Sequence, residues 1–234
     1  MNQLKTQFIA TVSHEFRTPL SAISSNLQLL DLYNETWPVE KKKIAFQRIH
    51  HAVKEMITLL NDLSVVAKDQ SGKLKINPTV FNLEQFCLEL IRDTIAILDP
   101  LANIRFEFTC KRPEVTLDKE LLRYILSNLL SNAIKFTTGH EEVLFTISNP
   151  DDQTIQFQIS DNGIGISHED LFNIFEPFHR GGNVAEFPGT GLGLSIVKRC
   201  VDLQHGYINV TSELKKGTLI TVLLPQLFHQ SLSL

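Results

Sequence analysis

Residues 9–30, IATVSHEFRTPLSAISSNLQLL, carry the apolar pattern that decides the first part of the fold. In heptads that start at position a with Ile9, the a and d positions hold the apolar set Ile9, Val12, Phe16, Pro19, Ile23 and Leu30. Residues 40–67 repeat this pattern at three- and four-residue steps, and residues 33–39 between them contain the turn formers Asn34 and Pro38. The pattern predicts two helices joined as a hairpin.

One hairpin of this size has too little core to be stable alone. Both helices carry wide apolar stripes, which predict that two copies of the chain pair into a dimeric four-helix bundle. Residues 1–70 are therefore expected to form the hairpin domain, and the polar residues 71–79 are expected to be a linker.

From residue 80 to residue 234 the pattern changes to mixed helices and strands. Asn82 and Asp118 are residue types that cap the N-termini of helices. They predict one helix from Asn82 to about Leu98 and another from Asp118 to about Phe136. A third helix is expected over 191–204. Alternating apolar residues predict strands over 104–108, 115–117, 143–147, 155–159, 207–212 and 217–224. These elements predict an α/β sandwich, a mostly antiparallel or mixed sheet with helices on one face.

Composition excludes several classes of protein. The 234 residues are 43% hydrophobic and 21% charged, which excludes a disordered or collagen-like chain. No apolar run approaches the ~18 residues that cross a bilayer. A formal net charge of −4 gives no broad basic field for nucleic acid or anionic lipid. The three cysteines are scattered without zinc spacing and indicate a reducing, cytoplasmic compartment.

His14 is the first candidate for chemistry. In the heptad frame it falls at position f, so it is expected to be exposed on the helix. Glu15 could hold the proton of one ring nitrogen, and the hydroxyl of Thr18, four residues on, could position a water. Pro19 costs a helix interior about 3 kcal/mol, which hints at function. A plain surface histidine is the alternative that these residues leave open.

Asn128, Asn132 and Lys135 share one face of the predicted helix 119–136. Asparagine is disfavoured inside helices, so two on one stripe call for a reason. An amide oxygen suits Mg²⁺ and an ammonium suits a phosphate. The alternative is an ordinary polar helix face.

Two glycine segments follow. Asp161-Asn162-Gly163-Ile164-Gly165 could let a flat base approach while Asp161 accepts a hydrogen bond from its amine, or it could be a hairpin turn. Gly189-Thr190-Gly191-Leu192-Gly193 precedes a helix, where consecutive amides can bind phosphates. A dinucleotide-fold fingerprint is disfavoured, because it should directly follow a strand. Residues 175–183 could form a lid between the two segments.

Together these segments resemble the catalytic core of two-component sensor histidine kinases. Five motifs of that family have counterparts here, in the same order along the chain. They are the phosphoacceptor box (residues 14–20), the N box (128–137), the first glycine box (161–165), the F box (175–178) and the second glycine box (189–193). The resemblance implies a dimerization and histidine-phosphotransfer hairpin followed by an ATP-binding domain of the gyrase–histidine kinase–MutL (GHKL) superfamily.

The resemblance also implies roles for single residues. His14 would take the γ-phosphoryl group of ATP, with Glu15 as the neighbouring base, and would pass it to an aspartate in the receiver domain of a response regulator. Thr18 matches the position associated with dephosphorylating that regulator. The remaining residues would bind Mg-ATP: Asn132 the metal, Asn128 the metal and phosphates, Lys135 and Arg180 the phosphates, Asp161 the adenine, and Gly163, Gly165, Gly189, Thr190, Gly191, Leu192 and Gly193 the nucleotide along the two glycine boxes.

The sequence departs from the family pattern at three places. His179 stands where the family commonly has an aromatic residue after the F box. A typical double glycine is replaced by Gln204-His205-Gly206-Tyr207, and the glycine that usually precedes the stretch Lys216-Gly217-Thr218 is absent. The last two are expected to affect turns only.

Two other functions remain. A conformational ATPase of the same superfamily would carry a carboxylate where this chain has Asn128, and a nucleotide-binding dimeric scaffold would lack turnover. No sensor, membrane or receiver segment is visible, so the chain is expected to be a truncated core whose full-length form has an input region, with a membrane anchor in some cases, before residue 1.

Overall fold

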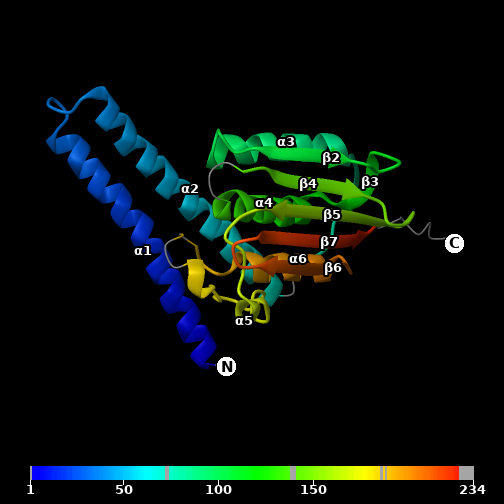
Figure 1. Cartoon of the computed structure of the whole chain (residues 1–234). Helices are drawn as coiled ribbons and strands as arrows, with labels where there is room; N and C mark the ends of the chain where they lie inside the picture. Colours follow the sequence, from blue (N-terminus) through cyan, green and yellow to red (C-terminus); the bar gives the residue numbers. More distant parts are fainter. Residues whose placement is uncertain (1, 72–73, 138–140, 185–186, 188, 227–234) are drawn as a thin grey trace. The chain divides into compact units, whose positions relative to one another are not determined.

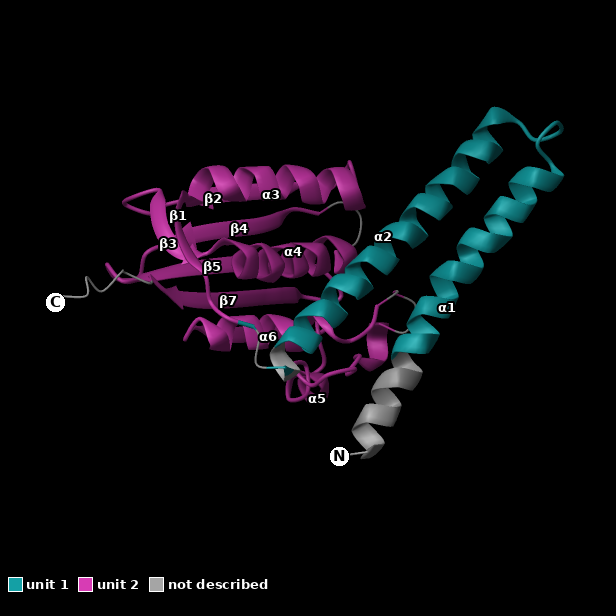
Figure 2. Cartoon of the chain, turned by 180° about the vertical axis from the view of Figure 1, so that it is seen from behind, with its two compact units in different colours: residues 1–74 teal, residues 75–234 magenta. Residues whose placement is uncertain are grey.

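The computed structural model describes residues 2–71, 74–137, 141–184, 187 and 189–226. The chain divides into two compact units, Met1–Leu74 and Lys75–Leu234 (Figure 2). Among the described residues, no helix has both the length and the apolar character needed to cross a bilayer.

The first unit is a helical hairpin. Helices α1 (Asn2–Leu32) and α2 (Val39–Gln70) are joined by a short turn, which confirms the predicted hairpin (Figure 1). The side chains buried between them are mostly small, namely Pro19, Ala45, Ala52 and Leu59 with the polar Asn26 and Asp62.

An apolar surface remains exposed on this hairpin. We call it the outer stripe; it consists of Leu20, Leu27, Phe46, Val53, Ile57 and Leu60. Several of its members are seven residues apart in the sequence, which places them on one helical face. The stripe is the feature expected of a surface that pairs with a second copy.

The second unit is built on a five-stranded mixed sheet. Its strand order is β2 (Ile104–Phe108), β4 (Val143–Ser148), β5 (Thr154–Asp161), β7 (Gly217–Pro225) and β6 (Tyr207–Glu213). Strands β2 and β4 are parallel and the other neighbours are antiparallel. Helices α3 (Leu83–Leu98), α4 (Lys119–Phe136) and α6 (Gly193–Leu203) cover one face, as Figures 1 and 2 show. The predicted sandwich is confirmed.

A second, two-stranded sheet was not predicted. Strand β1 (Pro78–Asn82) pairs antiparallel with β3 (Glu114–Asp118), so the chain enters a strand inside the stretch expected to be linker. Five residues that begin with a proline have too little alternation to indicate a strand. Their pairing is set by β3, far along the sequence, which a local pattern does not report.

Asp118 joins this small sheet to helix α4. Its Oδ1 accepts the N–H groups of Glu120 and Leu121 at 3.0 and 2.9 Å, which confirms the predicted cap. Its Oδ2 accepts the N–H of Asn77 at 2.7 Å. The same buried carboxylate therefore starts α4 and fixes the segment that leads in from the hairpin.

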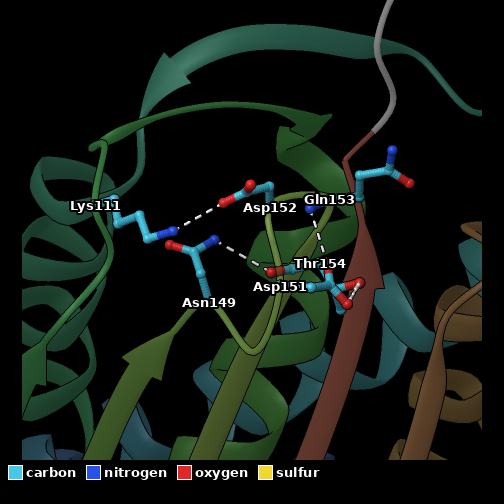
Figure 3. Close-up of polar contacts among 6 residues, drawn as sticks. All are labelled: Lys111, Asn149, Asp151, Asp152, Gln153 and Thr154. Atoms are coloured by element: carbon cyan, nitrogen blue, oxygen red, sulfur yellow. Dashed lines mark hydrogen bonds and ion pairs between the residues drawn. The ribbon is translucent and has the colours of Figure 1, made fainter.

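The predicted turn between β4 and β5 is also confirmed (Figure 3). Asp151 accepts from the backbone N–H of Gln153 at 2.8 Å and from the hydroxyl of Thr154 at 3.1 Å, and these hydrogen bonds lower the pKa of Asp151. Lys111 bridges to Asp152 at 2.9 Å from the neighbouring loop.

Candidate active site

His14 lies on the outside of α1. Its side chain is 73% exposed, as the heptad frame predicted, and its Nδ1 lies 3.9 Å from Oε1 of Glu15. The hydroxyl of Thr18 donates to the backbone carbonyl of His14 at 3.4 Å, so its side chain lies on the same helical face. Because Glu15 is nearest to Nδ1, the nitrogen Nε2 is the one directed to incoming groups.

The two asparagines of α4 are held together. Nδ2 of Asn132 donates to Oδ1 of Asn128 at 3.2 Å, and this bond leaves Oδ1 of Asn132 as the acceptor of that amide. The opposite face of α4 is buried through Leu122, Leu126, Leu129 and Leu130, as predicted. The packed leucines thus fix the rotation of the helix that presents the amides.

Lys135 lies in the last turn of α4, next to the second glycine segment. Its Nζ lies 4.9 Å from the ring centroid of Phe136. A Cβ built on Gly189 would lie 3.2 Å from this Nζ. The ammonium therefore lies beside Gly189, the first residue of the second glycine segment.

The first glycine segment lies against the end of α4. A Cβ on Gly163 would lie 2.3 Å from the carbonyl oxygen of Phe136, and the N–H of Ile164 donates to that oxygen at 3.1 Å. Gly165 has φ +66°, and a Cβ there would lie 2.0 Å from the carbonyl oxygen of Glu213. No other residue fits these two positions. The alternative of a simple hairpin turn is wrong, because α5 (His168–Leu171) follows the segment.

Asp161 ends β5 at the start of this segment. Burial raises the pKa of its carboxyl, although hydrogen bonds from Gly163 and Thr218 act in the opposite direction. Its Oδ1 accepts the N–H of Gly163 at 2.8 Å, which orients the carboxylate. A carboxylate that is partly desolvated and held in one orientation is suited to accept a hydrogen bond from the amine of a nucleotide base.

The second glycine segment contacts the amide pair of α4 directly. A Cβ on Gly193 would lie 2.5 Å from Nδ2 of Asn128, so only glycine leaves room for that amide. The hydroxyl of Thr190 accepts the N–H of Leu192 at 3.0 Å, and Leu192 is buried. Gly191 has φ +70°. The structure thus brings the second glycine segment to the polar face of α4 and the first glycine segment to the C-terminal end of that helix.

Arg180, the predicted phosphate contact, is bonded to backbone carbonyl groups of its own segment. Its Nη2 donates to the carbonyl oxygens of Val184 at 2.9 Å and Phe187 at 2.5 Å. It therefore stabilises the turn around the short 3₁₀-helix η1 (Gly182–Val184). Parts of the predicted lid are among the described residues, but residues 185, 186 and 188 lie outside them.

Two of the three departures from the family pattern fall at turns with a left-handed residue. His205 has φ 56° and Lys215 has φ 62°, the left-handed region in which a glycine is favoured. These are the two places where the sequence lacks expected glycines, and both changes affect turns, as predicted.

Sequence reasoning missed a contact between Asp170 of α5 and His179. Nε2 of His179 lies 3.2 Å from Oδ1 of Asp170. The side chain of Ser167 caps α5 by accepting the N–H of Asp170 at 3.1 Å. A serine three residues before an aspartate is a capping signal, but nothing local indicates the pairing with His179.

Comparisons with known proteins agree with this geometry. The phospho-acceptor domain of histidine kinases, His Kinase A, matches residues 4–72, and the histidine kinase-, DNA gyrase B- and HSP90-like ATPase family matches residues 117–227. The chain is a sensor histidine kinase catalytic core. This histidine kinase core is 36% identical over 232 residues to the virulence sensor protein BvgS of Bordetella bronchiseptica, a match that covers 94% of the chain and 18% of BvgS.

Solved histidine kinases share the fold. The histidine kinase AdeS of Acinetobacter baumannii has a TM-score of 0.67 at 22% identity, over 91% of this chain and 98% of that one. Full-length ShkA in complex with AMPPNP has a TM-score of 0.60 at 28% identity, over 94% of this chain and 46% of that one. This histidine kinase core spans less than a third of the length of the curated relatives it matches.

Proposed function

We propose that this chain is an ATP-dependent protein-histidine kinase that phosphorylates its own His14. One observation carries the proposal, namely that the chain holds both parts that the reaction needs. The hairpin presents a histidine that is 73% exposed beside a carboxylate, and the other unit brings two amides and two glycine segments together. Residues 1–70 would then be the dimerization and phosphotransfer domain, residues 71–79 the linker and residues 80–234 the ATP-binding domain.

The chemical step follows from the orientation of His14. Its Nε2 lone pair attacks the γ-phosphorus of ATP, the bond from that phosphorus to the bridging oxygen breaks, and ADP leaves with the electron pair. The proton on Nδ1 passes to Glu15, whose Oε1 lies 3.9 Å away. By taking this proton, Glu15 removes the positive charge that the ring would otherwise carry after its attack on phosphorus.

The nucleotide would lie between the polar face of α4 and the two glycine segments. Asp161 accepts from the adenine amine, while Lys135 and the N–H groups of 189–193 neutralise phosphate charge. The amide pair fits Mg²⁺, since Asn132 offers a neutral oxygen and phosphate oxygens and water would complete the shell. When bound, the metal withdraws charge from the phosphates.

Two partners follow from the hairpin. The outer stripe would pair with a second copy of the chain. An aspartate in the receiver domain of a response regulator would take the phosphoryl group from His14. Thr18, one turn away from His14, would position the water that later removes the phosphoryl group from that aspartate. The three free cysteines suit a cytoplasmic setting.

The test is incubation with γ-labelled ATP and Mg²⁺. Wild type should acquire acid-labile, base-stable label, and His14→Gln and Asn132→Asp should not. Label that survives in His14→Gln would place the acceptor elsewhere. Wild type that binds ATP but stays unlabelled would favour the scaffold, and ATP hydrolysis without label would favour the conformational ATPase.

A further inference from the structure

Asp170 and His179 form a shielded pair close to the second glycine segment. Their side chains are 20% and 25% exposed, and Nε2 of His179 lies 3.2 Å from Oδ1 of Asp170. This nitrogen is screened from solvent and makes no hydrogen bond of good geometry among the described residues, so the carboxylate is the polar group that faces it. An unprotonated Nε2 would turn its lone pair toward a negative oxygen. A proton on Nε2 would make this contact favourable.

The backbone of Phe178 and His179 lies against Gly191 in the second glycine segment. The preceding residue, Phe178, has φ +66°, a conformation that costs a bulky residue energy. Its N–H donates to the carbonyl oxygen of Gly191 at 2.9 Å. A Cβ on Gly191 would lie 2.8 Å from the carbonyl oxygen of His179. The second glycine segment thus packs against the backbone of residues 178–179.

Asp170 is bonded to Ser167, just beyond the first glycine segment. Its Oδ2 accepts the hydroxyl of Ser167 at 2.7 Å, two residues after Gly165. Asn183 donates to the carbonyl oxygen of Gly165 at 2.9 Å and so ties the chain beyond His179 to the same segment. The contact between Asp170 and His179 therefore joins the residues that follow the first glycine segment to the residues that contact the second.

We propose that Asp170 and His179 are positioning residues for the nucleotide: their contact sets the separation of the two glycine segments and holds Phe178 in its strained conformation. The inference rests on the proposed binding of ATP between these segments. Neither side chain takes part in the chemical step. Loss of the pair should therefore weaken nucleotide binding while the reaction at saturating ATP proceeds normally.

The test measures binding of Mg-ADP by calorimetry to the whole chain, which needs no phosphoryl transfer. His179→Leu keeps the volume of the side chain but removes its N–H, and it should weaken binding about tenfold. His179→Gln restores an N–H at a similar reach and should bind within about threefold of wild type. In an Asp170→Ala background, His179→Leu should cost no more than about twofold, since the pair is already broken.

A matched control exists in the hairpin. His51 lies 3.5 Å from Glu55 in a more exposed histidine–carboxylate pair, and His51→Leu should leave ADP affinity unchanged. The rate of labelling of His14 gives a second readout: His179→Leu should raise KM for ATP about tenfold with kcat within twofold. A structural defect would lower the thermal stability of the nucleotide-free chain and would not be rescued by His179→Gln.

The outcomes separate this inference from the proposed function. Unchanged ADP affinity in His179→Leu, or equal losses in His179→Leu and His179→Gln, would overturn the inference alone. A wild type that binds no nucleotide would overturn the proposed function and the inference together.

Discussion

Replacing Gly193 by alanine should lower kinase activity while leaving the fold at least as stable as in wild type. An added Cβ would lie 2.5 Å from Nδ2 of Asn128, and ordinary contact begins at 3.4 Å, so the amide has to move by 3.4 − 2.5 = 0.9 Å. The displaced group is the end of a side chain, which can rotate, so the backbone is spared. A shift of about 1 Å in a positioning group can cost on the order of a hundredfold in rate.

Stability should change in the opposite direction. Gly193 is the first residue of α6 and does not have a positive φ, so alanine should favour the helix by up to about 1 kcal/mol. The rate of His14 labelling and the thermal unfolding temperature measure the two effects on one sample. Gly182→Ala is the matched control, because nothing lies within 4 Å of its Cβ position. Wild-type activity in Gly193→Ala would refute the placement of Asn128 against this glycine.

Three further predictions address other parts of the chain. Lys215→Gly should raise the free energy of unfolding by about 0.5 kcal/mol, because glycine adopts the left-handed conformation of Lys215 without strain and this outweighs the larger chain entropy of the unfolded state. Lys215→Ala should not raise the thermal unfolding temperature. Burial raises the pKa of Asp161 above 3.8, so ionisation costs the native state more than the unfolded state, and wild type loses stability as pH rises from 3.8 through the folded pKa. The unfolding temperature of Asp161→Asn relative to wild type should therefore increase from pH 3 to pH 7, and a difference that does not change with pH would contradict this cause. Leu60→Lys should weaken the dimer about a hundredfold in sedimentation experiments, since two leucines leave the interface, whereas Leu101→Lys, at an equally exposed leucine of the other unit, should not.

Much of this fold could be predicted from local signals. The outward direction of His14 follows from the heptad frame, because helical periodicity fixes which residues face a partner helix. The start of α4 follows from Asp118, because a cap is satisfied within three residues. The amide face of that helix follows from the spacing of Asn128 and Asn132.

The features that were missed depend on contacts between distant segments. Strand β1 exists because β3 pairs with it, and its own five residues do not indicate a strand. The hydrogen bonds from Arg180 to carbonyl oxygens depend on the turn around η1, which no local pattern indicates. The pair of Asp170 and His179 depends on the path of the chain between α5 and the second glycine segment, which no periodicity reports.

The two bonds of Asp118 have a mechanical consequence. The chain coming from the hairpin is anchored at Asn77 to the carboxylate that also begins the helix of Asn128 and Asn132. A pull on the incoming strand would load this junction before it reached the large sheet. Tension that reaches Asn77 would therefore act on this hydrogen bond and on the β1–β3 ladder together, and both lead directly into α4.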